Sequence, residues 1–527
     1  MCRCGGGYAC ADLHRRCFDV CEISKGKEAM TDKIKRVFYA VFAVCFTFVL
    51  INVIFFNEYA KAMPLVLTTA ACLAVIAGVC VLTGKLEGQA EKHYKKILVI
   101  FAAVMFIAEV ALGLLLRYSP MWDVGAVQNG ASEWVKTGTF ASQYDYYNHF
   151  PNNLGGMWFL YVFAKAASWV GVQDQYAVYV FVNSALLVSA MTLVSLICKR
   201  LGGIKCAVFA LAAFALSPQF YFMGGAVYTD SLSMLFPVLS FWLYLKSKEL
   251  ESKRKIISYI IIGAAVAVGA LIKVTVLIGG IAILIDICLE RNLKEILKYA
   301  VCVTGIVAVV MLSFDGYIYP KHLTRENHNR YARPYIHWVM MGLKGDGRYN
   351  GGDYTFTDSF HTLQERTEKD WEETIKRINK LGAGGIFKLI SRKSAIDFGD
   401  GTYGISDFLN IQPKNKTWLH DWILYDSKNY DTYNTYATSL HIALMLLMLA
   451  GAYIMVIDKK ADRNKLLVPY LAVFGVWLFL LCWETHRRYF SNYAPMIFIC
   501  ASVTAFRIKA YLVKNNKKTK NLKKIKK

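Results

Sequence analysis

Apolar runs long enough to cross a lipid bilayer recur along this chain and constrain its fold more than any other feature. Hydrocarbon offers no hydrogen-bonding partners, so a crossing segment must be a helix of roughly 20 residues. Hydrophobic residues make up 56% of the 527 residues, a proportion typical of membrane proteins. We therefore predict an all-α polytopic membrane protein. About twelve runs are long enough, near 36–56, 64–83, 97–116, 176–197, 206–224, 231–247, 256–271, 274–290, 295–313, 438–457, 466–483 and 489–508.

Basic residues indicate which ends of these helices share a side. The formal net charge is +23, and the lysines and arginines gather in the tail 511–527 and in short links. Cytoplasmic loops carry an excess of lysine and arginine, so we expect these links and both termini to be cytoplasmic. The lysines are not interleaved with aromatic residues, which argues against nucleic acid as a partner, whereas the tail suits contact with anionic lipid headgroups. The links are 85–96, 199–205, 246–255, 291–298 and 459–465.

The segment 155–172 is apolar, but the charge pattern predicts that it does not cross the membrane. If it did, every later basic link would lie on the wrong side. The segment is also short and interrupted by Lys165. We expect an interfacial helix on the outer surface, within a first external loop that spans 117–175.

The polar segments between the runs complete the predicted domain organisation. The longest has roughly 120 residues, enough for a small domain, and we expect a mixed extracytoplasmic loop domain with an amphipathic helix at 367–382. Met30 begins MTDKIKRVFYAVFAV, which resembles a natural start, so residues 1–29 are a candidate start-site artefact. The predicted units are a cytoplasmic segment 1–33, two additional membrane helices in 34–96, a membrane core 97–313, the loop domain 314–436, C-terminal helices 437–510 and a basic cytoplasmic tail 511–527.

The positions of the 14 cysteines argue against both a disulfide framework and a metal site. None lies in the large polar loop, where an extracellular disulfide framework would be expected. Five crowd the N-terminal segment at uneven spacing with only His14 nearby, which is a weak match to a zinc site. We therefore expect no metal and no other cofactor. These five are Cys2, Cys4, Cys10, Cys17 and Cys21.

Charged residues collect at the predicted outer face, where we expect the chemistry to take place. A charge at this depth is costly unless it is paired or lines a water-filled cavity. A carboxylate can accept the proton of an attacking hydroxyl, while lysine and arginine can hold a phosphate and stabilise the charge that develops on it. This combination suggests transfer from a lipid-linked phosphate donor. The candidates are Asp123, Asp230, Lys273, Glu484, Arg487 and Arg488, with Asp145 and His149 as further substrate-binding candidates.

Each main candidate also has a purely structural interpretation. Asp123 and Asp230 suit the capping of the helices that follow them. The position of Lys273 is typical of a lysine at a helix end whose ammonium extends toward the lipid headgroups. The positions of the two arginines are typical of anchors at the outer interface. Glu484 is equally suited to pair with one of those arginines.

Four short stretches contain most of these candidates: MWDVGAVQNGASEW with Asp123, YTDSLSMLF with Asp230, ALIKVTVL with Lys273 and RRYFSNYAPM with Arg487 and Arg488. Together they resemble the GT-C class of membrane glycosyltransferases, especially the protein O-mannosyltransferase and aminoarabinose transferase-like (glycosyltransferase family 39-like) group. The resemblance covers residues 97–313 and the last outer turn, and it implies a GT-C-like helical bundle with external interfacial helices. Many members carry paired acidic residues in the first loop, whereas Val124 follows Asp123 here, so no divalent metal is expected.

We predict a glycosyltransferase that moves a sugar from a polyprenyl-phosphate-linked donor to a cell-envelope glycan, lipid or protein on the extracytoplasmic face. In this prediction Asp123 is the base, Asp230 orients substrate, and Lys273 with one of the two arginines clamps the phosphate. The alternative is a flippase or transporter of lipid-linked sugars, although transporters usually place ionisable groups near the bilayer midplane between repeats. A third alternative is an envelope-assembly protein whose large external loop only binds partners.

Overall fold

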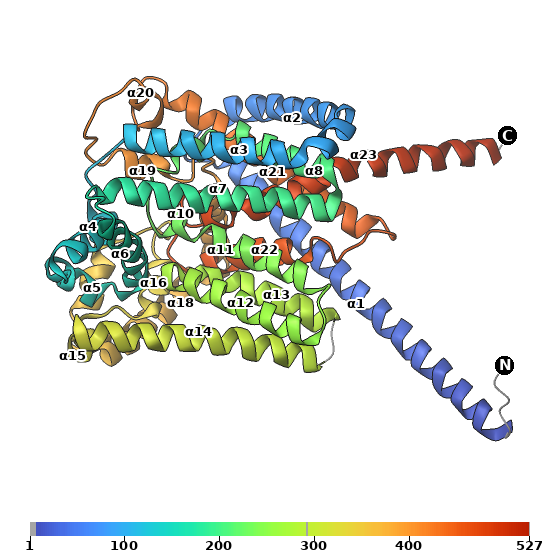
Figure 1. Cartoon of the computed structure of the whole chain (residues 1–527), viewed down its shortest axis with the longest axis horizontal. Coiled ribbons are helices and arrows are strands. Elements are labelled where there is room, and N and C mark those ends of the chain that lie inside the picture. Colours follow the sequence, from blue (N-terminus) through green and yellow to red (C-terminus); the bar gives the residue numbers. More distant parts are fainter. Residues whose placement is uncertain (1–6, 291–292, 526–527) are drawn as a thin grey trace.

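The computed structural model describes the backbone of residues 7–290 and 293–525 and the side chains of residues 29–290, 293–508 and 511. Within these residues the chain forms helices joined by turns, and extended pairing is limited to an isolated bridge between Tyr118 and Pro413. The long helices run side by side in a bundle (Figure 1). The N-terminal cysteines, the candidate start-site segment and nearly all of the basic tail lie outside the residues whose side chains are described.

Seven helices in the described part of the chain are long and apolar enough to cross a membrane. This confirms the predicted all-α membrane fold. The seven spans are Ala29–Phe55 within α1 (Gly7–Phe55), α2 (Ala62–Lys85), α3 (Glu87–Leu115), α7 (Gln175–Gly202), α12 (Ser252–Ile272), α14 (Leu293–Lys321) and α21 (Tyr430–Ile457).

Helices also occupy the other predicted runs, but four of them are shorter than a span of roughly 20 residues. Pro218 separates two helices within the run 206–224, and Pro237 lies in the first turn of the helix that follows the break at Met234. Proline lacks the N–H that would continue a helix. The count of about twelve spans therefore stays a prediction. The short helices are α8 (Ile204–Leu216), α11 (Leu235–Ser247), α13 (Leu277–Glu290) and α22 (Leu467–Cys482), and α23 (Ala494–Ile525) fills the last run.

The lysine-rich links lie at the same end of the bundle as both termini (Figure 1). Ion pairs join neighbouring links there: Lys205 Nζ lies 2.7 Å from a Glu87 oxygen, and Lys35 and Lys248 both approach Glu290, at 3.0 and 3.1 Å. The links that the charge pattern assigns to one side of the membrane therefore lie at one end of the bundle.

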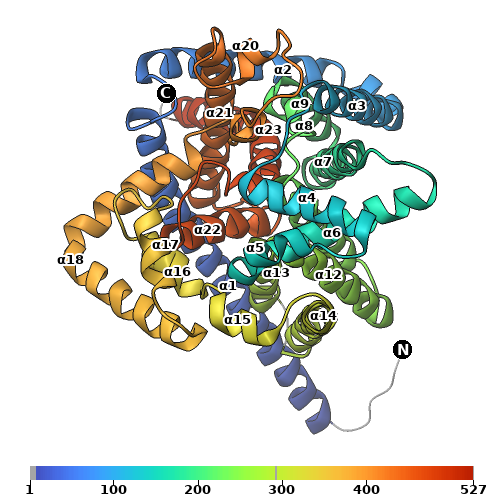
Figure 2. The ribbon, with the colours of Figure 1, turned by 90° about the vertical axis from the view of Figure 1, so that its left-hand side faces the viewer.

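The opposite end of the bundle is covered by three helices that lie across it, α4 (Trp122–Thr137), α5 (Tyr144–His149) and α6 (Leu154–Trp169) (Figure 2). Trp134 of α4 stacks on Tyr161 of α6 with ring centroids 4.1 Å apart, which fixes the two helices against each other. α6 is the segment that we predicted would not cross, and it lies at a steep angle to the long helices (Figure 2).

The large polar segment is helical, and the prediction of a mixed domain is wrong for the described residues. Its turn-rich stretches, LKGDGRYNGGDY and DFGDGTYG, connect helices rather than strands. α14 also continues to Lys321, past the predicted exit at Phe314, and α21 begins at Tyr430 rather than near Ala437. The helices between them are α15 (Arg325–Tyr331), α16 (Tyr335–Met341), α17 (Gly351–Asp358), α18 (Leu363–Phe398), α19 (Ile405–Leu409) and α20 (His420–Ile423).

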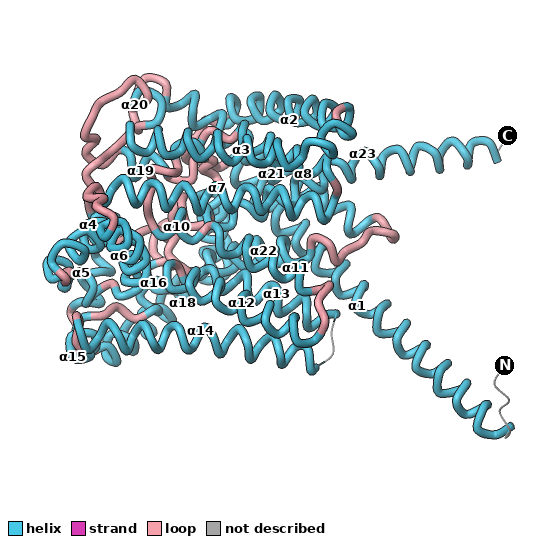
Figure 3. Tube along the Cα trace, viewed as in Figure 1, coloured by secondary structure: helices cyan, strands magenta, loops and turns pink. Residues whose placement is uncertain are grey.

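Helix α18 contains the predicted amphipathic helix 367–382 and ties this segment to the bundle. It bends at Gly382, where φ is 57°, a left-handed conformation that glycine adopts without steric cost. Beyond the bend it packs on α1 through Phe48 and Phe387, whose ring centroids are 5.5 Å apart. The longest loops lie at the end of the bundle away from the termini (Figure 3), so the external segment and the first loop meet there.

Candidate functional site

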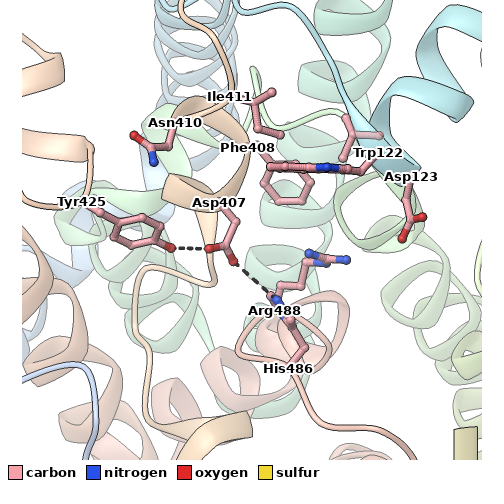
Figure 4. A pocket seen from close by; sticks show the side chains of 10 residues that line it. Trp122, Asp123, Asp407, Phe408, Asn410, Ile411, Tyr425, His486 and Arg488 are labelled. Carbon is pink, nitrogen blue, oxygen red and sulfur yellow. Dashed lines mark hydrogen bonds and ion pairs between the residues drawn. The ribbon is translucent and has the colours of Figure 1, made fainter. Parts of the chain in front are cut away.

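A cavity of about 390 Å³ opens at the end of the bundle opposite the termini, and three distant parts of the chain line it (Figure 4). The start of α4 forms one wall, the external segment around α19 forms another, and the turn after α22 forms the third. The lining residues are Trp122, Asp123, Val124, Asp407, Phe408, Asn410, Ile411, Tyr425, His486 and Arg488.

Backbone pairing holds the first two walls together. Tyr118 and Pro413 form an antiparallel bridge. Beside it, the amide of Ser119 donates to the carbonyl of Gln412 at 3.1 Å, and the amide of Lys414 donates to the carbonyl of Arg117 at 2.8 Å. The loop that precedes α4 is therefore fixed to the loop that follows α19.

Asp123 lines the cavity from the first turn of α4 and is half-buried. The hydroxyl of Tyr146 donates to its Oδ1 at 2.8 Å, and the Asn153 amide in turn donates to that hydroxyl at 2.6 Å. Its Oδ2 makes no hydrogen bond to any described residue. The carboxylate caps no described backbone group of α4, so the interpretation of Asp123 as a helix cap is wrong, and one oxygen remains available to a molecule in the cavity.

Asp230 lies behind the cavity wall, where it joins two cations. It is 4% exposed on the short helix α10 (Thr229–Ser233). Lys273 donates to its Oδ1, and the Nε of Arg488 lies 3.3 Å from its Oδ2. The Lys273 ammonium also lies 5.0 Å from the ring centroid of Tyr489. Lys273 therefore points into the protein rather than toward headgroups, and the sequence-predicted residues Asp230, Lys273 and Arg488 form one cluster.

Arg487 belongs to a second charged cluster around Asp407. Its Nε lies 3.6 Å from the Asp407 carboxylate, and its guanidinium lies over the rings of Tyr59 and Tyr425 at 4.7 and 4.9 Å. The Tyr425 hydroxyl donates to Asp407 at 2.5 Å. Arg488 reaches the cavity but Arg487 is directed to this neighbouring cluster, so the two arginines have different surroundings.

Glu484 and His486 precede the arginines in the same turn. Burial, together with the nearby charges of Arg488 and Arg487, lowers the pKa of His486 well below its usual value, so its imidazole is neutral. Glu484 is 4% exposed, and burial raises its pKa to about 7, partly offset by Arg488 and increased by Asp123. Glu484 forms no ion pair within 4 Å with either arginine, both of which are described, so the predicted pairing alternative is wrong.

Asp145 and His149 do not join this site. The Asp145 side chain is 95% exposed and lies 3.9 Å from the His149 ring. The His149 ring packs on Tyr331 with centroids 5.4 Å apart, and neither residue lines the cavity. Their proposed contact with substrate remains a prediction.

Sequence reasoning missed Asp407, Tyr425 and Trp122, which all line the cavity. The stretch DFGDGTYGISDF offered a signal, since two of its aspartates flank a glycine-rich turn at the end of a helix. What brings Asp407 to the membrane face is the backbone pairing with the first loop, and a pairing between segments almost 300 residues apart leaves no local pattern in a sequence.

Comparison with known proteins gives a family and a distant structural likeness. The model of a family described as "Conserved hypothetical integral membrane protein" matches residues 27–508, and no curated protein matches the chain. The archaeal oligosaccharyltransferase AglB from Archaeoglobus fulgidus, in complex with an inhibitory peptide and a dolichol-phosphate, is similar at 14% identity and a TM-score of 0.43 over 81% of this chain. The apo form of the Archaeoglobus fulgidus oligosaccharyltransferase is similar at 16% identity and 0.41 over 80%. The chain spans about half the length of these proteins, 52% in each case.

Proposed function

We propose that this chain, which belongs to the family of conserved hypothetical integral membrane proteins, is a glycosyltransferase that uses a polyprenyl-phosphate-linked sugar as donor. The observation that carries the proposal is that Asp123 and Arg488 line one cavity. Figure 4 shows the Arg488 guanidinium directed toward the side of the cavity that holds Asp123. A base and a phosphate-binding cation that face one space are what this transfer requires.

In the proposed reaction the oxygen of an acceptor hydroxyl attacks the anomeric carbon of the donor sugar. The bond from that carbon to the phosphate oxygen breaks, and the electron pair leaves with the polyprenyl phosphate. Asp123 takes the hydroxyl proton on its open Oδ2, while Tyr146 holds Oδ1 at 2.8 Å. A base positioned in this way contributes roughly 10²- to 10⁴-fold to a rate.

The cluster behind the cavity supplies positive charge for the leaving phosphate. Lys273 and Arg488 carry two positive charges and Asp230 carries one negative charge, so the group of three keeps a net charge of one positive. We therefore propose that Asp230 places the two cations instead of touching the sugar, which refines the role expected from the sequence. Charges fixed in a site that excludes water stabilise a leaving group more than free ions do.

The position of the cavity supports a lipid-linked donor and an extracytoplasmic site. It lies at the end of the bundle away from the lysine-rich links, and such links are cytoplasmic in most membrane proteins. We propose an extracytoplasmic site, open to a prenyl lipid from the bilayer and to a glycan, lipid or protein acceptor from outside. We also propose that no divalent cation takes part, because Val124 stands where a second acidic residue would be needed beside Asp123.

A flippase for lipid-linked sugars is the second candidate. It would use the same cations to bind phosphate without breaking a bond. Transporters usually place their ionisable groups near the bilayer midplane, whereas Asp123, Asp407 and Arg488 line a cavity at one end of the helices. The end-on position favours the transferase.

Transfer in reconstituted vesicles separates the two candidates. Radiolabelled polyprenyl-phosphate-sugar is supplied with a mixture of envelope acceptors, and release of free polyprenyl phosphate is followed for wild type, Asp123→Asn and Asp431→Asn. Asp431 is the control, because it is exposed on α21 and lies outside the cavity. Release that Asp123→Asn abolishes and Asp431→Asn preserves supports the transferase. Sugar-lipid that crosses the bilayer intact, with no release in any of the three proteins, rejects it in favour of the flippase.

A further inference from the structure

Trp122 is the most exposed aromatic residue of the cavity wall, and its backbone is unusual. The side chain is 75% exposed although it lines the cavity. Its φ is 52°, a left-handed conformation that is a genuine outlier for a bulky residue. Such strain persists where the surrounding structure enforces it and is common at ligand-binding sites. The chain thus holds a large indole at the cavity without burying it.

The surrounding structure explains how this conformation is maintained. The Tyr118–Pro413 bridge fixes the chain just before Trp122, and the amide of Gly125 donates to the carbonyl of Met121 at 2.8 Å just after it. The space at Gly125 is tight, because a Cβ there would lie 3.0 Å from the carbonyl oxygen of Pro120. Trp122 is therefore held from both sides by contacts that do not involve its own side chain.

Two other residues of the cavity lining offer hydrogen-bonding groups. Asn410 is exposed and its side-chain amide contacts no described hydrogen-bonding partner, and Asp123 offers its open Oδ2. The buried side chains of Phe408 and Ile411 form the apolar wall beside them. Figure 4 shows Trp122 beside Phe408, with Asp123 on one side of the two rings and Asn410 on the other.

We propose that Trp122 and Asn410 form the subsite that binds the sugar ring, an inference that rests on the proposed function. The face of an aromatic ring carries partial negative charge, so it attracts the C–H groups on the apolar face of a pyranose. The same pyranose presents hydroxyls at its rim, which match the amide of Asn410 and the carboxylate of Asp123. A small number of placed polar groups beside an apolar surface is the usual composition of a ligand site.

The subsite is tested by direct sugar binding, apart from turnover. Saturation-transfer NMR is recorded on the purified full-length protein in detergent with the methyl glycosides of mannose, glucose, galactose and N-acetylglucosamine. Trp122→Ala and Asn410→Ala are compared with wild type and with Trp169→Ala. Trp169 is the matched control, because it is 77% exposed at the end of α6 and lies outside the cavity.

We expect saturation transfer to at least one glycoside, with affinity about tenfold weaker in Trp122→Ala and Asn410→Ala and unchanged in Trp169→Ala. Trp122→Phe is expected to keep most of the binding, since it keeps an aromatic face. Absence of binding to all four glycosides, or equal binding by wild type and Trp122→Ala, overturns the subsite. Equal loss of membrane reconstitution in both tryptophan variants, with sugar binding unaffected, assigns Trp122 to the membrane interface instead. Transfer and sugar binding are measured separately. Polyprenyl phosphate release that Trp122→Ala leaves unchanged rejects the subsite alone. Sugar binding without any release of polyprenyl phosphate rejects the transferase alone.

Discussion

Asp230 and Arg488 form an ion pair in which the carboxylate Oδ2 and the guanidinium Nε lie 3.3 Å apart. Both are largely buried, and the other oxygen of Asp230 is taken by Lys273. Arg488 alone of the three lines the cavity. The position of the cavity cation is therefore set by a residue that does not itself reach the cavity.

Replacing Asp230 by asparagine should destabilise the protein. Two cations then lose their counter-charge in a poorly solvated environment, and removal of one member of a buried ion pair typically costs roughly 3–5 kcal/mol. We expect a lower midpoint of thermal unfolding in detergent and loss of polyprenyl phosphate release. Asp431→Asn is the control, since Asp431 is exposed on α21 and lies outside the cavity. An unchanged midpoint in Asp230→Asn would show that the pair has no structural role.

Tyr146→Phe should slow transfer without unfolding the protein. It removes the hydroxyl that donates to Asp123 at 2.8 Å, and a hydrogen bond to a charged group contributes roughly 1.5–3 kcal/mol. We expect a kcat at least about tenfold lower and a modest fall in the thermal midpoint, because the variant also leaves the Asn153 amide without its partner. Tyr144→Phe is the matched control on the same helix, since the Tyr144 hydroxyl bonds to Thr139 at 2.6 Å instead. Equal activity of the two variants would contradict the role of Asp123 as a base held by Tyr146.

The sequence predicted the helices well because their cause is local. Apolar runs, lysine-rich links and the interruption at Lys165 each act over a few residues, and they yielded the helical class, the common end of the links and a helix at 154–169 that lies across the bundle. The short lengths of α11 and α13 were missed, because hydropathy alone does not reveal where a helix ends.

Part of the site was also predicted, because the position of a charged residue beside an apolar run is a local feature of the sequence. Asp123, Asp230, Lys273 and Arg488 stand out because charges at the ends of apolar runs are costly, and the structure brings the last three into one cluster. Asp407 was missed, and the roles of Arg487 and Arg488 were not separable, because the surroundings of each depend on contacts between distant segments. A sequence shows which residues are charged but not which of them share a partner.

The stability of the protein should depend on the protonation of Glu484. Burial raises its pKa from 4.5 to about 7, so the folded state binds the proton more tightly than the unfolded chain does. The free energy of unfolding should then fall as the pH rises from about 4.5 to about 7, by an amount on the order of 3 kcal/mol. Glu484→Gln stays neutral and should lack this decrease.

The difference in thermal midpoint between wild type and Glu484→Gln measures this effect. The thermal midpoint of Glu484→Gln should rise relative to that of wild type as the pH is raised from about 5 to about 8. Glu326→Gln serves as control, because Glu326 is exposed on α15 at the same end of the bundle. A difference between wild type and Glu484→Gln that stays constant with pH would show that Glu484 is ionised throughout.

Lys393 should affect donor binding although it lies outside the cavity. Its ammonium donates to the carbonyls of Leu481 at 3.0 Å and Trp483 at 2.5 Å, at the end of α22. One helical turn further along α18, Asp397 accepts hydrogen bonds from the Thr485 hydroxyl and the His486 amide. α18 therefore holds the turn that carries Arg487 and Arg488 at two points.

Lys393→Met should loosen this turn and so raise KM for the polyprenyl-phosphate-sugar donor about tenfold, with a smaller change in kcat. The side chain keeps its length and apolar stem, so the packing of α18 on α1 should be retained. Lys388→Met is the matched control, because Lys388 is exposed on the same helix. A fall in kcat at constant KM would mean that Lys393 acts on the chemical step. A loss of folded protein in Lys393→Met but not in Lys393→Arg would mean that the charge of Lys393 is needed for stability alone.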